Sequence, residues 1–250
     1  MDSIRKYPRT QHLQGSGLQK GDDPSRMPFV LLRNKFLVVE EKLDGANTGI
    51  SFDENGTLQL QCRGHYLTGG PGEAQFALLK PWAQTHQSWL WERLGTRYIL
   101  YGEWLYACHT VFYDQLPHYF FEFDILDTHT DCFLSTAKRR EMLAGGPVLS
   151  VPVLKEGAFS KLTDITKLVG PSQYKSDGGV SEGLYLKWEE DGEVKGRYKW
   201  VRSGFIQTIL DLGTHWKDRP LVPNRLAEGV DLWQEPTRLV PRHPPCPMEG

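Results

Sequence analysis

The sequence predicts an α+β fold built mainly from antiparallel sheets. Short runs of β-branched, aromatic and other apolar residues gather in three parts of the chain, at 36–62, 98–127 and 182–202. Gly, Asn and Asp turn signals separate neighbouring runs. Helical periodicity occurs between these parts, at 73–94 and 136–145. Strands that come in groups, with helices between the groups, favour α+β over a regularly alternating parallel sheet.

The first group of strands surrounds a short polar segment. FLVVEE (36–41) and TGISF (48–52) carry apolar and β-branched residues, and DENG (53–56) is a turn signal before the strand TLQLQCR. We therefore expect Lys42 at the end of a strand, within a meander of short antiparallel strands. The stretch from Glu73 to Leu94 has apolar residues at helical spacing and little Gly or Pro beyond Pro81, so it predicts a helix, with an interruption left open.

The remaining elements follow in the same way. RYILYGEWLYA and HYFFEFDILD have strand composition, and TAKRREMLAG predicts a helix with Ser135 or Thr136 as N-cap and Gly145 as stop. GLYLKWEEDGEVKGRYKWV predicts a hairpin closed by Asp191 and Gly192, and FIQTILDL predicts a last helix. We expect one domain at 1–215, including an N-terminal arm, and a short proline-rich extension at 216–250 that is partly disordered.

Composition narrows the classes of protein that the chain can belong to. A formal net charge of -2 excludes a protein that is basic all over, so a nucleic-acid partner must be held by a local patch. Four cysteines without CxxC spacing predict neither a zinc site nor a disulfide framework. No P-loop motif is present. The sequence has no long apolar run and begins with polar residues, so we expect no membrane partner and a cytoplasmic location.

The segment KLDGAN at 42–47 is the first candidate for chemistry. A nucleophilic lysine must lose its proton, which burial or cationic neighbours favour by lowering its pKa. Gly45 would let the backbone turn tightly beside a ligand, while Asp44 and Asn47 offer an acceptor and an amide. Taken alone, this segment fits a surface lysine before a turn equally well.

Further short segments follow in a fixed order: CRG at 62–64, YGEW at 101–104, FFEFDIL at 120–126, EGLYLK at 182–187 and RYKWVR at 197–202. Together with KLDGAN they resemble the ordered motifs of the covalent nucleotidyltransferases, which are the polynucleotide ligases and the RNA capping enzymes. DNA ligases and capping enzymes usually carry arginine where this chain has Asn47. That difference resembles the ATP-dependent RNA ligases of the phage T4 RNA ligase 2 type.

The resemblance implies a fold and a reaction. The fold is an antiparallel-sheet nucleotidyltransferase domain, ATP-grasp-like, with a nucleotide cleft between sheets; too few residues follow Arg202 for a C-terminal OB domain. Lys42 would take AMP from ATP with Mg²⁺ or Mn²⁺, pass it to a 5′-phosphate RNA end, and release it when a 3′-hydroxyl attacks. A kinase or phosphatase that heals RNA ends would be a fitting partner.

The resemblance also implies roles for individual residues. The catalytic set is Lys42, Asp44, Asn47 and Lys199. Phe123 would stack on adenine, with Phe121 on the same strand face, Glu41 would face the adenine edge, and the remaining nucleotide contacts would come from Arg63, Glu103, Lys187, Arg197 and Lys199. Glu182 and Glu103 would hold the metal. Arg202 competes with Arg197 for one position of the last basic motif.

Two other functions stay open at this stage. The first is a DNA-nick ligase or an mRNA-capping nucleotidyltransferase, both of which usually carry an OB domain. The second is an inactive nucleotide- or RNA-binding module, which would be expected to lose Lys42 or the carboxylates. In the N-terminal arm, Lys6, Arg9, His12 and Ser16 fit either phosphate contacts or a solvated terminus.

Overall fold

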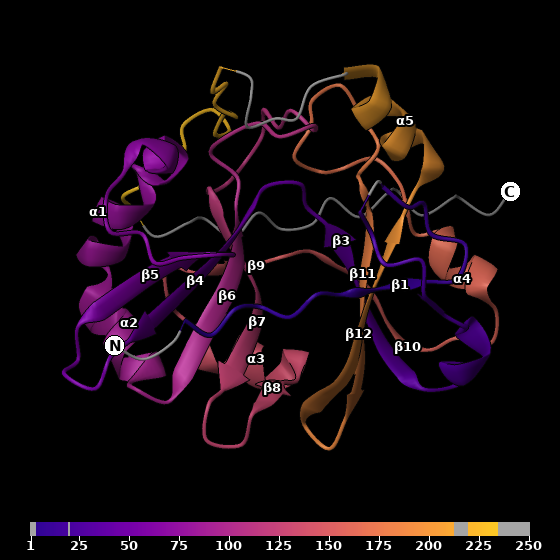
Figure 1. Ribbon diagram of the computed structural model, residues 1–250, viewed down its shortest axis with the longest axis horizontal. Helices are drawn as coiled ribbons and strands as arrows, with labels where there is room; N and C mark the ends of the chain where they lie inside the picture. The colour runs from indigo at the N-terminus through magenta and orange to yellow at the C-terminus, as the bar shows by residue number, and fades with distance from the viewer. Residues whose placement is uncertain (1–3, 20, 213–219, 235–250) are drawn as a thin grey trace, which may run out of the picture.

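A computed structural model describes residues 4–19, 21–212 and 220–234. Its strands form one hydrogen-bonded sheet in two groups that stand side by side (Figure 1). The first group holds β1 (Gln11–Leu13), β2 (Arg26–Met27), β3 (Phe36–Lys42), β10 (Val153–Ala158), β11 (Gly183–Glu190) and β12 (Glu193–Val201). The second holds β4 (Ala46–Phe52), β5 (Leu58–Cys62), β6 (Tyr98–Trp104), β7 (Phe120–Asp127) and β9 (Leu149–Ser150). The short β8 (Cys132–Leu134) pairs with both β12 and β7 and joins the groups.

The predicted antiparallel α+β architecture is confirmed. The path β10-β3-β11-β12-β8-β7-β6-β4-β5 is antiparallel throughout, and the parallel pairs involve only the short strands β1, β2 and β9. The predicted hairpin of β11 and β12 turns at Asp191 and Gly192, with φ of 55° and 76°. Positive φ at both central residues is the requirement of a type I′ turn, which Asp-Gly meets at low cost.

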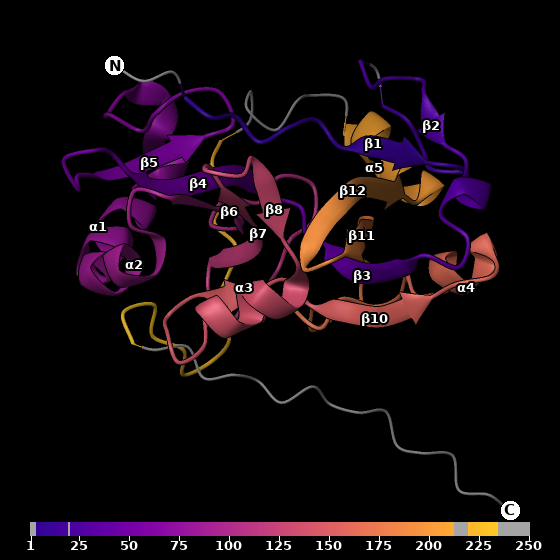
Figure 2. The ribbon, with the colours of Figure 1, turned by 90° about the horizontal axis from the view of Figure 1, so that it is seen from below.

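Helices flank the two groups of strands, and one helix lies where the groups meet (Figure 2). The second group is covered by η2 (Pro71–Phe76), α1 (Leu79–Thr85) and α2 (Gln87–Leu94), and the other helices are η1 (Phe29–Leu31), α3 (Thr136–Met142), α4 (Leu162–Thr166) and α5 (Ser203–Leu212). The long helix expected at 73–94 is thus interrupted, but at His86. Pro81 lies in the first turn of α1, where its missing N–H removes no helical hydrogen bond. None of the described helices is long and apolar enough to span a bilayer.

The expected meander around Lys42 is wrong at one point. β3 pairs with β10 and β11, whereas β4 pairs with β5 and β6, so the chain crosses from one group to the other just after Lys42. The crossing explains Gly45 by contact with β6: a Cβ atom there would lie 2.7 Å from the carbonyl oxygen of Trp104 and 2.6 Å from Leu105 Cδ2. The crossing sets Lys42 at the seam between the two groups.

Part of the predicted C-terminal extension belongs to the domain. Residues 222–227 run along the segment 105–116, where Ala107 pairs with Pro223 and Leu116 with Leu226. The side chain of Asn224 accepts a bond from Tyr113 N at 2.9 Å and donates to Leu105 O at 2.7 Å. The sequence did not predict this pairing, because single bridges, unlike a regular strand, leave no alternating pattern in a proline-rich segment. Residues 216–219 and 235–250, on which the prediction of disorder also rests, lie outside the described residues.

Candidate active site

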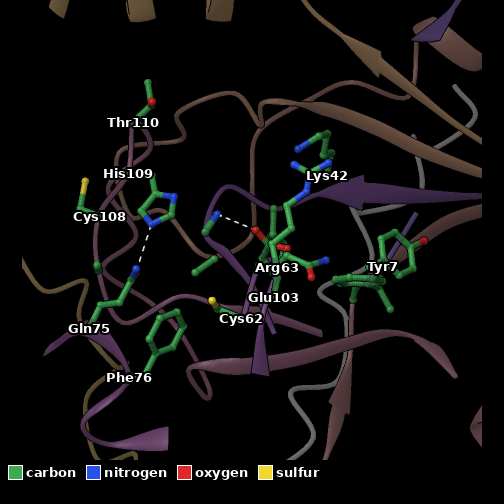
Figure 3. A pocket seen from close by; sticks show the side chains of 18 of the residues that line it. Tyr7, Lys42, Cys62, Arg63, Gln75, Phe76, Glu103, Cys108, His109 and Thr110 are labelled. Atoms are coloured by element: carbon green, nitrogen blue, oxygen red, sulfur yellow. Dashed lines mark hydrogen bonds between the residues drawn. The ribbon is translucent and has the colours of Figure 1, made fainter. Parts of the chain in front are cut away.

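A cavity of about 1280 Å³ opens at the seam between the two groups of strands. Figure 3 shows Tyr7 at one end, Cys108, His109 and Thr110 at the other, and Lys42 and Glu103 between them. The predicted site residues that line this cavity are Glu41, Lys42, Asn47, Arg63, Glu103, Phe123 and Lys199. The fold therefore brings together residues from β3, β4, β6, β7 and β12 that are far apart along the chain.

Lys42 lies among carboxylates. Its Nζ donates to Glu182 Oε2 at 2.7 Å, and its side chain is 24% exposed. Burial disfavours the charged amine, but the carboxylates of Glu182, Glu103 and Asp44 outweigh that effect, so the pKa of Lys42 is raised above its ordinary value. The expectation of a lowered pKa is thus wrong for the protein by itself, because this site surrounds the lysine with acids.

The carboxyl groups beside Lys42 hold their protons more tightly than usual. Burial raises the pKa of Glu103 to about 8 and that of Glu182 to about 7, although the ammonium of Lys42 pulls both down. Within the described residues, no three His, Cys, Asp or Glu side chains stand together to hold a metal alone. Two carboxylates nevertheless suit Mg²⁺, which is usually bound through one or two carboxylates plus substrate phosphates.

Asp44 has a positioning task away from the cavity wall. Its Oδ2 accepts hydrogen bonds from Thr110 N at 2.7 Å and Val111 N at 2.8 Å, and its own N–H donates to Tyr113 Oη at 3.0 Å. Asp44 is absent from the residues that line the cavity. The resemblance implied a place in the catalytic set for Asp44; in the fold, its side chain ties the crossing after β3 to the segment 105–113.

The aromatic end of the cavity is formed by Phe123 and Tyr185, whose ring centroids are 6.3 Å apart at 36°. Phe121 does not share this place. The pairing of β6 with β7 shifts between Tyr101 and Gly102, so that Phe123 is an extra, bulged residue. The bulge breaks the two-residue alternation, and Phe121 is fully buried against Tyr174.

Glu41 lines the cavity, and its contact with the adenine edge stays a prediction. Burial raises the pKa of its carboxyl group to about 7. Its Oε1 is buried without a hydrogen-bond partner in the protein. Because Tyr185 pairs with Glu40, the Glu41 side chain points to the other face of β3.

Two predicted phosphate contacts lie behind the cavity wall. Tyr185 and Lys199 are paired across β11 and β12 and line the cavity; the next pair on that face, Lys187 and Arg197, is two residues further from it. Lys187 is fully buried and donates to Glu40 at 3.0 Å and to the carbonyl of Phe123. The nucleotide contact expected of Lys187 is therefore corrected: its amine binds the backbone carbonyl of Phe123 and so positions that residue.

Arg197 and Arg202 have other partners. The Arg197 guanidinium lies 3.9 Å from the ring centroid of Phe133 and 4.0 Å from Asp124. It is absent from the cavity lining, so its predicted phosphate contact is also corrected. Arg202 donates through Nε to Ser181 O at 2.7 Å. Of the last basic motif, Lys199 is the cation on the cavity wall.

The N-terminal arm supplies residues that sequence reasoning missed. Tyr7 lines the cavity, and its hydroxyl contacts Asp124 and Tyr185. Lys199 Nζ lies 3.3 Å from Asp22 Oδ1. Tyrosine and aspartate in a polar segment give no periodic signal, so only the fold could reveal them. Of the arm residues that were singled out, Lys6 and Arg9 are exposed.

His12 and Ser16 of the same arm are buried. His12 Nε2 lies 3.2 Å from Asp22 Oδ2, and its Nδ1 lies 2.8 Å from Ser16 Oγ. Burial and the charge of Lys199 lower the pKa of His12. Asp22 therefore stands between a histidine and the cavity lysine and holds both in position.

Comparison with known proteins identifies a family. A family model described as RNA ligase matches residues 35–201, which is more than half of the chain. No curated protein matches the chain.

Solved structures of one relative resemble this fold. Naegleria gruberi RNA ligase with PPi has a TM-score of 0.57 and 18% identity, and the match covers 84% of this chain and 64% of that one. A mutant of the same ligase with ATP and Mn has a TM-score of 0.56 and 17% identity, with 81% and 61% covered. At this identity the likeness supports the fold alone, and the chain spans less than two thirds of that ligase.

Proposed function

Because the chain belongs to the RNA ligase family, we propose that it is an ATP-dependent enzyme that seals RNA ends carrying a 5′-phosphate and a 3′-hydroxyl. The observation that carries the proposal is the Lys42 amine in the cavity, 2.7 Å from Glu182 and under the influence of the half-buried Glu103. A lysine in such a setting, with stacking rings at one end of the same cavity, fits a nucleophile for the α-phosphate of a nucleotide.

The adenosine would occupy the aromatic end of the cavity. Stacking on the rings of Phe123 and Tyr185 is worth about 1–3 kcal/mol by the usual range for a base on an aromatic side chain. The contact expected between Glu41 and the adenine edge would involve its backbone, because Tyr185 pairs with Glu40 and the Glu41 side chain points to the other face of β3. Lys199 on the cavity wall would neutralise phosphate charge.

In the first step, the Lys42 amine attacks the α-phosphorus, the bond to the β-phosphate oxygen breaks, and pyrophosphate leaves. The ammonium must first give up a proton. Glu182 Oε2 lies within hydrogen-bond distance at 2.7 Å, and the pKa of about 7 of this carboxyl group suits proton acceptance near neutral pH. The product is a lysyl-AMP phosphoramidate.

A divalent ion fits the same carboxylates. Glu103 on the cavity wall and Glu182, which does not line the cavity but contacts Lys42, would hold Mg²⁺ or Mn²⁺ together with the substrate phosphates. A nearby cation would lower their raised pKa values. When bound, the ion supplies charge neutralisation for the phosphates during transfer. Without it, the carboxylates would repel the nucleotide.

The second and third steps use the RNA. AMP passes from Lys42 to the 5′-phosphate end, which gives an AMP-capped RNA, and attack by the 3′-hydroxyl then forms the phosphodiester and releases AMP. Arg63 lines the cavity and would bind the 5′-phosphate. Asn47 lies opposite Glu103 across β4 and β6, which supports a part for its amide in transfer to RNA.

The proposal is tested by labelling and sealing. Protein stripped of bound AMP with pyrophosphate is incubated with α-labelled ATP or GTP and magnesium, then with 5′-phosphorylated RNA or DNA. We expect an acid-labile adduct from ATP and joined RNA. Labelling by GTP alone would favour a capping-type enzyme, sealing of DNA alone a DNA-nick ligase, and no adduct an inactive binding module. An end-healing kinase or phosphatase partner and a cytoplasmic location stay expectations from the sequence.

A further inference from the structure

We propose that the end of the cavity opposite the adenosine holds the terminal nucleotide of the 5′-phosphate RNA strand, with its base unpaired. We call this end the distal chamber; it is lined by Phe76, Cys108, His109, Thr110, Leu221 and Val222. The inference rests on the proposed function and specifies the class of RNA end that the enzyme uses. The family match ends at residue 201, so Leu221 and Val222 add to the site from outside it.

The cavity is larger than one nucleotide needs. Its volume of about 1280 Å³ exceeds the roughly 300–1,000 Å³ of sites that enclose a single small molecule. In Figure 3, Tyr7 marks one end and Cys108 to Thr110 the other, with Lys42 between them. An adenosine beside Tyr7 therefore leaves the distal chamber for a second ligand on the other side of the nucleophile.

The charge of the lining changes along the cavity. Its acidic residues are Glu40, Glu41 and Glu103, which come from β3 and β6. The described residues that line the distal chamber include no acid, and Arg63 and His65 line the cavity just after β5. A phosphate is repelled by carboxylates and attracted by a guanidinium, so the 5′-phosphate is favoured beside Arg63, which lies near Lys42 and Glu103 in Figure 3, and the rest of the strand on the side without acids.

The chamber offers a wall for a base. His109 is almost fully buried, and its Nε2 lies 3.3 Å from Gln75 Oε1 (Figure 3), which fixes the plane of the ring. Phe76 provides an apolar surface beside it, and Leu221 and Val222 stand at the chamber with 44% and 52% of their surface exposed. Unstacked RNA bases bind in this manner, on histidine or phenylalanine rings with apolar neighbours.

Backbone bonds fix the chamber relative to Lys42. Asp44, two residues after the nucleophile, accepts the N–H groups of Thr110 and Val111. On the other side, Cys108 N donates to Val222 O at 2.8 Å. A base held in the chamber therefore brings its 5′-phosphate to a defined place near the lysyl-AMP, which is the requirement for in-line transfer.

The base in the chamber must be unpaired. A paired base keeps its Watson–Crick edge on the partner strand and cannot enter a cavity inside one domain unless it leaves the stack. The distal chamber thus predicts that single-stranded or frayed 5′-phosphate ends accept AMP faster than the same end within a nicked duplex.

The test measures transfer of labelled AMP from the isolated enzyme adduct to RNA in a single turnover. The probe is a 5′-phosphorylated oligoribonucleotide, used alone and as the downstream strand of a nicked duplex, with transfer expressed per adduct formed. We expect AMP transfer to the single strand to be about tenfold faster or more than transfer to the nicked duplex. In V222W the indole would occupy the place of the base, so transfer to the single strand should slow about tenfold, as for one lost stacking contact. The matched control is V30W, whose valine is 61% exposed and does not line the cavity.

A second pair of variants separates stacking from structure. H109A should lose transfer, and H109F, which keeps an aromatic ring, should recover most of it. Transfer that favours the nicked duplex, or is the same in V222W and wild type, would overturn the inference while leaving the adduct chemistry intact. Absence of any adduct in the wild-type protein would instead remove the proposed function, and the inference with it.

Discussion

The buried ion network beneath Phe123 gives a prediction with a defined magnitude. Arg139 is 1% exposed and donates to Glu122 at 2.5 Å and to Glu40 at 2.9 Å. Glu40 also pairs with Lys187, but within the described residues the other side-chain partner of Glu122 is only the hydroxyl of Ser150, at 2.8 Å. R139M would therefore leave a carboxylate in the core without a counter-charge.

Removing one partner of a buried pair costs about 3–5 kcal/mol, because the remaining charge stays desolvated. We expect R139M to lower the free energy of unfolding by that amount, measured by urea denaturation. The double variant R139M/E122Q should recover about half, since the amide carries no charge. A loss below about 1 kcal/mol, or a double variant less stable than R139M, would show that pairing of the buried charges is not how this network stabilises the fold.

Three further predictions concern the site. The raised pKa values of Glu103 and Glu182 mean that the native state binds more protons than the unfolded state, so stability should fall as pH rises from about 5 to 8, by up to about 1.4 kcal/mol per unit and carboxyl. E103Q should flatten that slope in urea titrations, and an unchanged slope would contradict it. D22N removes an interaction that raises the pKa of Lys199, so KM for ATP should begin to rise at a lower pH than in wild type; coincident pH profiles would count against this pairing. N47A should slow AMP transfer to RNA more than adduct formation, and equal losses in the two steps, timed separately, would argue against its proposed part.

Local sequence patterns predicted the elements better than their pairing. Alternation identified β3 and β4 separately, and Asp191-Gly192 fixed the hairpin of β11 and β12, because both signals act over a few residues. Which strands become neighbours depends on contacts far apart in sequence. The crossing at Gly45, forced by its approach to β6, could not be read from alternation.

The candidate site shows the same division. Lys42 and Glu103, from two of the ordered motifs, line one cavity, while their roles there stay predictions. The bulge at Phe123 breaks the alternation of β7, so the Phe121 side chain lies in the core. Lys187 lies two residues beyond Tyr185 on β11, so it is buried behind the cavity wall. Asp22 comes from a loop without periodicity, so its approach to a cavity lysine is visible only in the folded chain.

In the proposed reaction, Lys42 carries AMP as a covalent adduct. The most direct measurement is peptide mass spectrometry of the protein after incubation with ATP and magnesium, with K42A and the cavity variant K199A treated in parallel. We predict an AMP adduct on the peptide that contains Lys42, absent in K42A and reduced but still at residue 42 in K199A. An adduct on another residue, or one that persists in K42A, would contradict it.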